Sequence, residues 1–167
     1  DQLGRTDKLV RDTARVILDF AKQHEFVPMP GYTHMQHAMP SSIGQWAGAV
    51  VESLINDRIA LRAALELNDQ NPLGSGAGFG SGVPLDRQKT TEDLGFSRIQ
   101  RNPVYCQNSR GKIESMTITA LLQVMMTLGR LANDLVVFYS QEFGYFKIDP
   151  AMTTGSSMMP QKRNLDI

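Results

Sequence analysis

Apolar residues recur at helical spacing in three stretches of this chain. The first stretch has the three-and-four spacing of one helix face and predicts an amphipathic helix over about residues 4–24. In the second, Ser42 and Gln45 fit a capping box, and the stripe that follows predicts a long helix over about residues 42–69. The third predicts a helix over about residues 109–140 and is apolar nearly all round, which is typical of burial among several helices. The apolar positions that define the three stripes are Leu9, Val16, Ile17, Phe20; Ile43, Trp46, Val50, Leu54, Leu61; and Ile113, Ala120, Val124, Leu128, Leu131 and Leu135.

The segments between these stripes carry turn and breaker residues. Pro28 and Pro30 predict an irregular connector over residues 28–40, and glycines crowd a loop from Asn71 to Pro84. A short helix should follow from about residue 86 and end at Gly95. Asn102-Pro103 is expected to break the chain, and only residues 143–148 suit an extended stretch. We therefore predict an all-α fold, a bundle of long helices forming one central helical domain over residues 1–167.

Composition excludes some classes of partner and predicts the setting of the chain. Of 167 residues 41% are apolar and 20% charged, and Lys+Arg equals Asp+Glu at 17 each, so nucleic acid and membrane are not expected as partners. No run approaches the roughly 20 apolar residues of a membrane span. Cys106 is the single cysteine, which indicates a reducing, cytoplasmic setting without Cys-pair metal sites. Because the chain opens without Met, we expect a central piece of a longer polypeptide, lacking N- and C-terminal domains.

The segment Gly155–Asn164 carries the most specific chemistry. It reads Gly-Ser-Ser-Met-Met-Pro-Gln-Lys-Arg-Asn and combines two hydroxyls, an ammonium and an amide with no carboxylate. Such a group suits an anionic substrate on which further negative charge develops during reaction. A Gly-Ser-Ser triplet alone would be read as a flexible linker, but the continuation through Pro160, Lys162 and Asn164 favours a functional site.

A second cluster, Pro30–His37, adds imidazole groups. A lone histidine in a loop is more often a structural hydrogen-bonding residue than a catalyst, so His34 gains weight only from its place after Pro-Gly-Tyr-Thr. His37 is interpreted as a surface or supporting residue one helical turn further on. The glycine loop does not predict a nucleotide site, because no register of it gives Gly-x-Gly-x-x-Gly and no strand is expected before it.

These two segments resemble the superfamily of fumarase, aspartase, argininosuccinate lyase and adenylosuccinate lyase. The argininosuccinate lyase branch is the most similar on Pro30–Gln36, Pro72–Ala77 and Thr153–Asn164. Fumarases and aspartases have Gly-Lys-Val-Asn where this chain has Gln-Lys-Arg-Asn, and adenylosuccinate lyases usually have Ala after the serine pair. Leu165 departs from the family pattern, in which Pro is usual.

The resemblance implies a carbon–nitrogen lyase that splits argininosuccinate into arginine and fumarate by reversible β-elimination, in arginine biosynthesis, without a metal or other cofactor. It implies Ser156 as base, with Ser157 left open as the alternative, and His34 as proton donor or relay. It implies substrate binding by Thr33, Gln36, Ser157, Gln161, Lys162 and Asn164.

The family builds its site from three segments on different subunits of a homotetramer. The third segment and a glutamate that orients the histidine are not in this sequence, so the isolated chain is expected to be inactive. Another succinyl-adduct lyase, such as adenylosuccinate lyase, and a non-catalytic structural protein of the crystallin type remain the alternatives.

Overall fold

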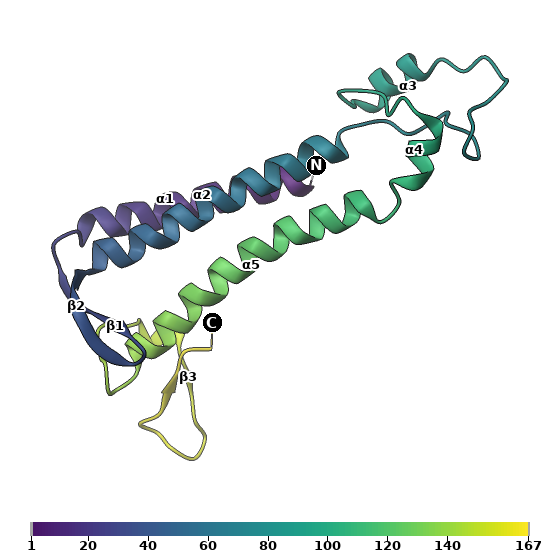
Figure 1. Ribbon diagram of the computed structural model, residues 1–167. Coiled ribbons are helices and arrows are strands. Elements are labelled where there is room, and N and C mark those ends of the chain that lie inside the picture. Colours follow the sequence, from purple (N-terminus) through teal and green to yellow (C-terminus); the bar gives the residue numbers. More distant parts are fainter. Residues whose placement is uncertain (1, 167) are drawn as a thin grey trace. The chain divides into compact units, whose positions relative to one another are not determined.

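The computed structural model describes residues 2–166, and the chain divides into two compact units, Asp1–Met125 and Met126–Ile167 (Figure 1). Helices carry the fold, as predicted. In chain order they are α1 (Gln2–Gln23), α2 (Ile43–Asn68), α3 (Arg87–Leu94), α4 (Pro103–Asn108) and α5 (Lys112–Tyr139), and α5 continues from the first unit into the second.

The core of the first unit is the antiparallel pair α1–α2 (Figure 1). Leu54 and Leu61 of α2 are fully buried, and small residues such as Ala14 and Ala47 let the two helices approach closely. Burying each leucine contributes roughly 2 kcal/mol. At the start of α2, a Cβ added to Gly44 would lie 2.6 Å from the Cα of Glu25, so only glycine fits this crossing of the backbones.

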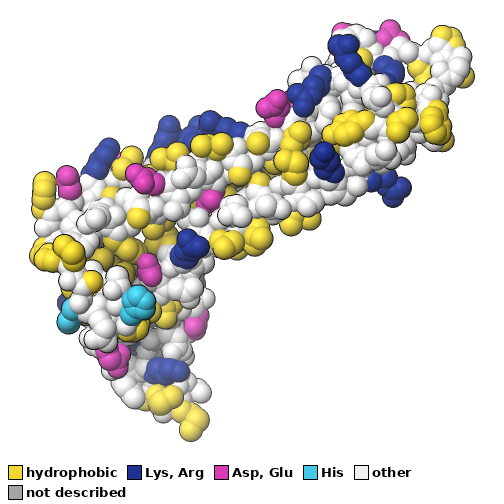
Figure 2. Space-filling view, viewed as in Figure 1, with side chains coloured by type: hydrophobic (Ala, Val, Ile, Leu, Met, Phe, Trp, Pro, Cys, Tyr) yellow, Lys and Arg dark blue, Asp and Glu magenta, His cyan; other side chains and the backbone are white. Residues whose placement is uncertain are grey.

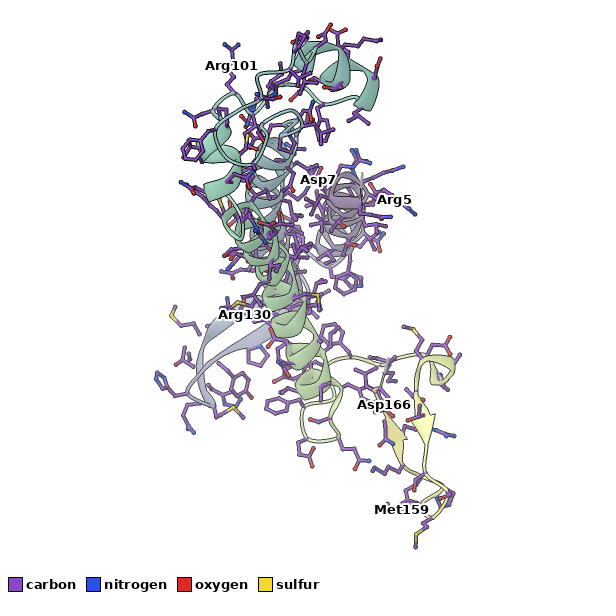
Figure 3. All side chains as sticks on the ribbon, turned by 90° about the vertical axis from the view of Figure 1, so that its right-hand side faces the viewer. Arg5, Asp7, Arg101, Arg130, Met159 and Asp166 are labelled. Atoms are coloured by element: carbon purple, nitrogen blue, oxygen red, sulfur yellow. The ribbon has the colours of Figure 1, made fainter. Side chains whose placement is uncertain are left out.

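An ion pair fastens the same two helices. Asp7 of α1, labelled in Figure 3, accepts hydrogen bonds from Nε and Nη2 of Arg58 on α2, at 2.8 and 2.9 Å. Both side chains are 16% exposed, and Arg62 lies 3.7 Å from the same carboxylate. The hydrogen bond from Arg58 lowers the pKa of Asp7 below its usual value, against the opposing effect of desolvation, and the same bond raises the pKa of Arg58.

A β-hairpin joins α1 to α2, and the prediction of an irregular connector there is wrong. Strand β1 (Pro28–Thr33) pairs antiparallel with β2 (Gln36–Ser42), with a register shift between Pro30 and Tyr32. Proline lacks a backbone N–H, but an isolated two-stranded hairpin needs only half of its backbone groups for pairing, so three prolines fit. Ser42 then caps α2 by accepting from the N–H of Gln45 at 3.1 Å, as predicted, while the Gln45 side chain accepts from the hydroxyl of Ser41.

A glycine-rich loop and the short helices α3 and α4 lie between α2 and α5 in the chain. Gly95 ends α3 in the left-handed conformation, as predicted, and Asp86 caps its start by accepting from the N–H of Lys89. Asn102-Pro103 does not break the chain but starts α4, because Asn102 caps the N–H of Tyr105 and proline is favoured in a first helical turn. The guanidinium of Arg87 donates to the backbone carbonyls of Leu73, Gln100 and Arg101, which fixes the base of the loop.

Helix α5 is long and largely uncovered within the described chain. Only Ala120 and Val124 of its residues are buried, whereas Ile118 and Met125 are 66% and 64% exposed. By length and composition α5 could span a membrane, which corrects the prediction that no run approaches that length. The core helix of a soluble protein can have the same length and composition. Residues 2–166 leave most of its apolar circumference exposed.

The second unit begins in the C-terminal half of α5 and ends in a small hairpin. The rings of Phe138 and Tyr145 lie 5.5 Å apart, and residues 143–148 form a turn and coil, not the predicted extended stretch. A 3-10 helix (Pro150–Met152) leads to β3 (Thr154–Gly155), which pairs antiparallel with β4 (Arg163–Asn164). The prediction that strands would be rare holds, but their places were missed.

Candidate active site in two hairpins

The first set of candidate residues surrounds the turn between β1 and β2. Thr33 and Gln36 are the last paired residues, and His34 and Met35 form the two-residue loop between them. His34 and Met35 have φ of 53° and 60°, the only positive values among the described residues other than glycine. Two left-handed residues in a two-residue hairpin loop make a type I′ turn, which matches the twist of the strands.

The left-handed backbone of this turn is unfavourable for the two residues that occupy it, His34 and Met35. Type I′ turns favour Asn-Gly, and a left-handed conformation costs roughly 1–2 kcal/mol at each residue that carries an ordinary Cβ. The side chains of Thr33, His34 and Gln36 are all exposed, so neither burial nor packing of these side chains offsets the cost. Histidine side chains gather on the surface around this hairpin (cyan in Figure 2). Sequence analysis placed His34 in an irregular loop, whereas the structure holds it in one defined backbone conformation.

Tyr32 and His37 form the cross-strand pair next to the turn. The Tyr32 hydroxyl hydrogen-bonds Nε2 of His37 at 2.5 Å, and the two ring centroids lie 4.7 Å apart. His37 was predicted one helical turn beyond His34, and the structure corrects this: it lies on β2, opposite Tyr32. Sequence reasoning missed the pair because the hairpin itself was missed. Residues five apart that flank a two-residue loop would have been the signal.

The second set of candidates lies on the loop that joins β3 to β4. Thr154 pairs with Asn164 and Gly155 with Arg163, so the strands enclose a loop of residues 156–162. This loop carries Ser156, Ser157, Gln161 and Lys162, and Asn164 lies at its base. Met159 lies at the far end of the loop, and the Lys162 N–H donates to the Met159 carbonyl at 2.9 Å (Figure 3). The Thr154 hydroxyl bonds the Asp166 carboxylate and fastens the open end of the hairpin.

Ser156 is distinguished from Ser157 by its hydrogen bonds. The Ser156 hydroxyl oxygen accepts from the backbone N–H groups of Met158 and Met159, at 3.3 and 3.1 Å. Ser156 is half-buried, whereas Ser157 is exposed. Two N–H dipoles aimed at one oxygen favour negative charge on it, so this geometry suits a serine that must lose its proton. Serine turns of this type are common. Their donors are backbone N–H groups, so the order of side chains in the sequence did not reveal them.

The predicted site residues therefore fall into two groups, one in each unit. Thr33, His34 and Gln36 lie together on the first hairpin, and Ser156, Ser157, Gln161, Lys162 and Asn164 lie together on the second. In the described part of the chain, no three or more His, Cys, Asp or Glu residues are placed to hold one metal ion. These residues could transfer protons through serine and imidazole, and their ammonium, amide and hydroxyl groups could bind an anion.

Comparison with known proteins identifies the family of the chain. A family model described as lyase matches residues 5–166, and the chain belongs to that lyase family. Argininosuccinate lyase of Bacteroides fragilis is 45% identical over 166 residues, 99% of this chain and 37% of the relative. Argininosuccinate lyase of Stenotrophomonas maltophilia is 45% identical over 167 residues, 100% of this chain and 39% of the relative. The chain thus spans well under half the length of these curated relatives.

Solved structures share the fold. EDDS lyase in complex with formate superposes with a TM-score of 0.94 at 28% identity, over 99% of this chain and 33% of that one. Class II fumarase from Schistosoma mansoni superposes with a TM-score of 0.74 at 19% identity, over 93% of this chain and 37% of that one, which shows the fold alone. The all-α architecture of long helices is therefore shared with these solved structures.

Proposed function

We propose that the protein is a carbon–nitrogen lyase that cleaves argininosuccinate to arginine and fumarate. The names of the 45% identical relatives support the substrate, and an EDDS lyase variant of the same fold has been solved with bound fumarate. The observation that carries the proposal is the Ser156 hydroxyl, which accepts hydrogen bonds from two backbone N–H groups in a loop that also carries Lys162, with Asn164 at its base.

The reaction begins with removal of a proton from the carbon next to a substrate carboxylate. That proton is only weakly acidic, so the base must be strong and the resulting aci-carboxylate must be stabilised. Ser156 takes the proton, its alkoxide form being favoured by the N–H groups of Met158 and Met159 and by the charge of Lys162. Lys162 and Asn164 hold the reacting carboxylate, and Ser157, Gln161 and Gln36 contribute further hydrogen bonds to the substrate.

The second half of the reaction forms fumarate. The electron pair left on carbon becomes the C=C bond, and the carbon–nitrogen bond breaks toward nitrogen. Thr33 binds a carboxylate through its hydroxyl, and His34 supplies or relays the proton that the leaving nitrogen takes up. No cofactor is needed, because the reaction involves no net oxidation and the charges are stabilised by side chains and backbone.

We further propose that the intact protein is a cytoplasmic homo-oligomer, a tetramer by resemblance, in which other subunits cover α5. Its exposed apolar side chains, among them Ile118, Leu122 and Met125, support this. Exposure of so much apolar surface on one helix is unusual in a monomer. Arg130 and Asp134 in the C-terminal half of the helix favour a protein environment over lipid, since charges within a bilayer are costly. Light scattering of the intact protein should give a mass near four chains.

Substitution of the base tests the function. In the intact protein, Ser156→Ala should reduce fumarate release from argininosuccinate by about 10³-fold or more, because groups that act as a unit fail together. Ser157→Ala is the matched control and should chiefly raise KM. Circular dichroism should be unchanged in both variants. Residual activity of Ser156→Ala within about tenfold of the parent would reject its role as base.

A substrate panel separates the proposed activity from its alternatives. Fumarate release from argininosuccinate but not from adenylosuccinate is the expected result. Preference for adenylosuccinate would assign the protein to another succinyl-adduct lyase. Failure to turn over either adduct, by a correctly folded oligomer, would favour a structural role of the crystallin type.

A further inference from the structure

The turn that carries His34 has a feature that the proposed reaction does not use. Its two left-handed residues, His34 and Met35, lie directly beside the hydrogen-bonded pair of Tyr32 and His37. Strained backbone conformations persist only where the surrounding structure imposes them. Among the described contacts of this hairpin, the Tyr32–His37 bond is the side-chain bond that links the two strands next to the turn.

We infer that Tyr32 and His37 form a clamp that holds the β1–β2 turn in its left-handed conformation and thereby positions His34. The inference rests on the proposed function, in which His34 moves the proton to the leaving nitrogen. Neither member of the clamp needs to touch the substrate, so both are positioning residues.

The geometry supports a clamp in three ways. The two residues are register partners, so a bond between their side chains joins the strands without distorting the backbone. The tilted rings, at 55° between planes, are in contact as well as hydrogen-bonded. Tyr32 is half-buried while His37 is exposed, so the tyrosine anchors the pair to the protein and the histidine closes it from outside.

A clamp is needed here because the register is irregular just before it. The pairing shifts between Pro30 and Tyr32, at Gly31, where an added Cβ would lie 2.9 Å from the Met39 carbonyl oxygen. A bulge bends a strand and increases its local twist, so the pair that follows it sets how the two strands enter the turn. The pair beyond the bulge therefore determines where the turn falls.

A double-mutant cycle tests the clamp in the intact protein. Tyr32→Phe and His37→Phe keep a ring at each position but remove the hydrogen bond. Each should lower kcat for argininosuccinate by about tenfold or more with little change in KM, since misplacing a reacting group chiefly affects turnover. The double variant should cost no more than either single one, because both remove the same interaction. Tyr105→Phe, an exposed tyrosine of α4, is the control and should be unchanged.

A rescue experiment separates positioning from a merely structural role. Met35 is 71% exposed, and glycine adopts its left-handed conformation without strain. Met35→Gly should therefore restore most of the kcat lost in Tyr32→Phe. Absence of rescue, or loss of activity in His37→Phe but not in Tyr32→Phe, would overturn the clamp.

Amide hydrogen exchange of the hairpin supplies a readout that needs no substrate. Residues 32–37 should exchange faster in Tyr32→Phe and return toward the parent rate when Met35→Gly is added. Unchanged exchange would overturn the clamp even if the protein proved inactive on argininosuccinate. Inactivity of the parent together with the expected exchange pattern would instead reject the proposed function, so the two failures are distinguishable.

Discussion

The two hairpins that carry the candidate residues hold them in different ways. The β1–β2 hairpin closes with a two-residue loop, so the strands and the Tyr32–His37 bond determine the backbone around His34. The β3–β4 hairpin has strands of two residues each and encloses a seven-residue loop, Ser156 to Lys162. In this loop local hydrogen bonds from the backbone arrange the groups around Ser156. One hairpin positions a side chain through strand pairing, and the other prepares an oxygen through its own peptide N–H groups.

The largest expected effect on kcat comes from removing the His34 imidazole while keeping the backbone conformation of its turn. Asparagine tolerates the left-handed conformation, so His34→Asn should keep the type I′ turn and remove only the proton donor. Loss of a general acid typically costs about 10²–10⁴ in rate. Kinetics on the intact protein should show this loss in kcat, and His24→Asn, at the end of α1, is the matched control. Activity within about threefold of the parent would remove His34 from the proposed mechanism.

The second prediction tests whether a backbone N–H of the β3–β4 loop stabilises the Ser156 oxygen. Met159→Pro deletes an N–H that donates to the Ser156 oxygen, whereas Met159→Ala keeps it and removes only an exposed side chain. By analogy with the loss of one oxyanion donor, the proline variant should lose about 10²–10³ in kcat and the alanine variant little. The limb of the kcat/KM profile that rises with pH should also move to higher pH, because the serine alkoxide is less stabilised. Equal kinetics for the two variants would contradict a role for this donor.

A smaller effect lies in a region that belongs to neither hairpin. Asp7→Asn breaks the charged hydrogen bonds between α1 and α2 and should lower the free energy of unfolding by about 1–3 kcal/mol. Because folding lowers the pKa of Asp7, its stabilising effect is present above the unfolded carboxyl pKa of about 3.9 and is lost as the pH falls through the folded value. Urea midpoints of parent and variant should therefore differ at neutral pH and converge below about pH 4. A constant difference down to acidic pH would show that the charge is not responsible.

The smallest expected effect compares glycine in the two hairpins. Met35→Gly relieves a left-handed residue and should stabilise the protein by up to about 1 kcal/mol, after the entropic cost of glycine. Gly155→Ala should change stability little, because an added Cβ there would meet only the flexible end of Arg163, at 3.3 Å. Thermal melts of both variants measure the contrast. Destabilisation by Met35→Gly would mean that the turn is not strained.

Periodicity and capping residues determined most of the helical fold. The apolar stripes predicted α1, α2 and α5 to within a few residues, and Ser42 and Gly95 marked helix ends because a capping side chain or a left-handed glycine acts within one turn. The same local logic correctly ended the first helix before Pro28, but it missed that the prolines after it lie in a hairpin and that Pro103 begins α4. Whether proline ends an element depends on whether its missing N–H would have been needed, and that is decided by the neighbouring strand or the position in the helix.

The sequence by itself determined the chemistry of the candidate site, since hydroxyl, imidazole, ammonium and amide groups stand in two short motifs. Only the tertiary structure decided how these groups are held. The left-handed turn at His34, the Tyr32–His37 bond and the two N–H groups on Ser156 arise from strand register and backbone direction. Backbone groups are the same at every residue, so a sequence cannot show where they point until the chain is folded.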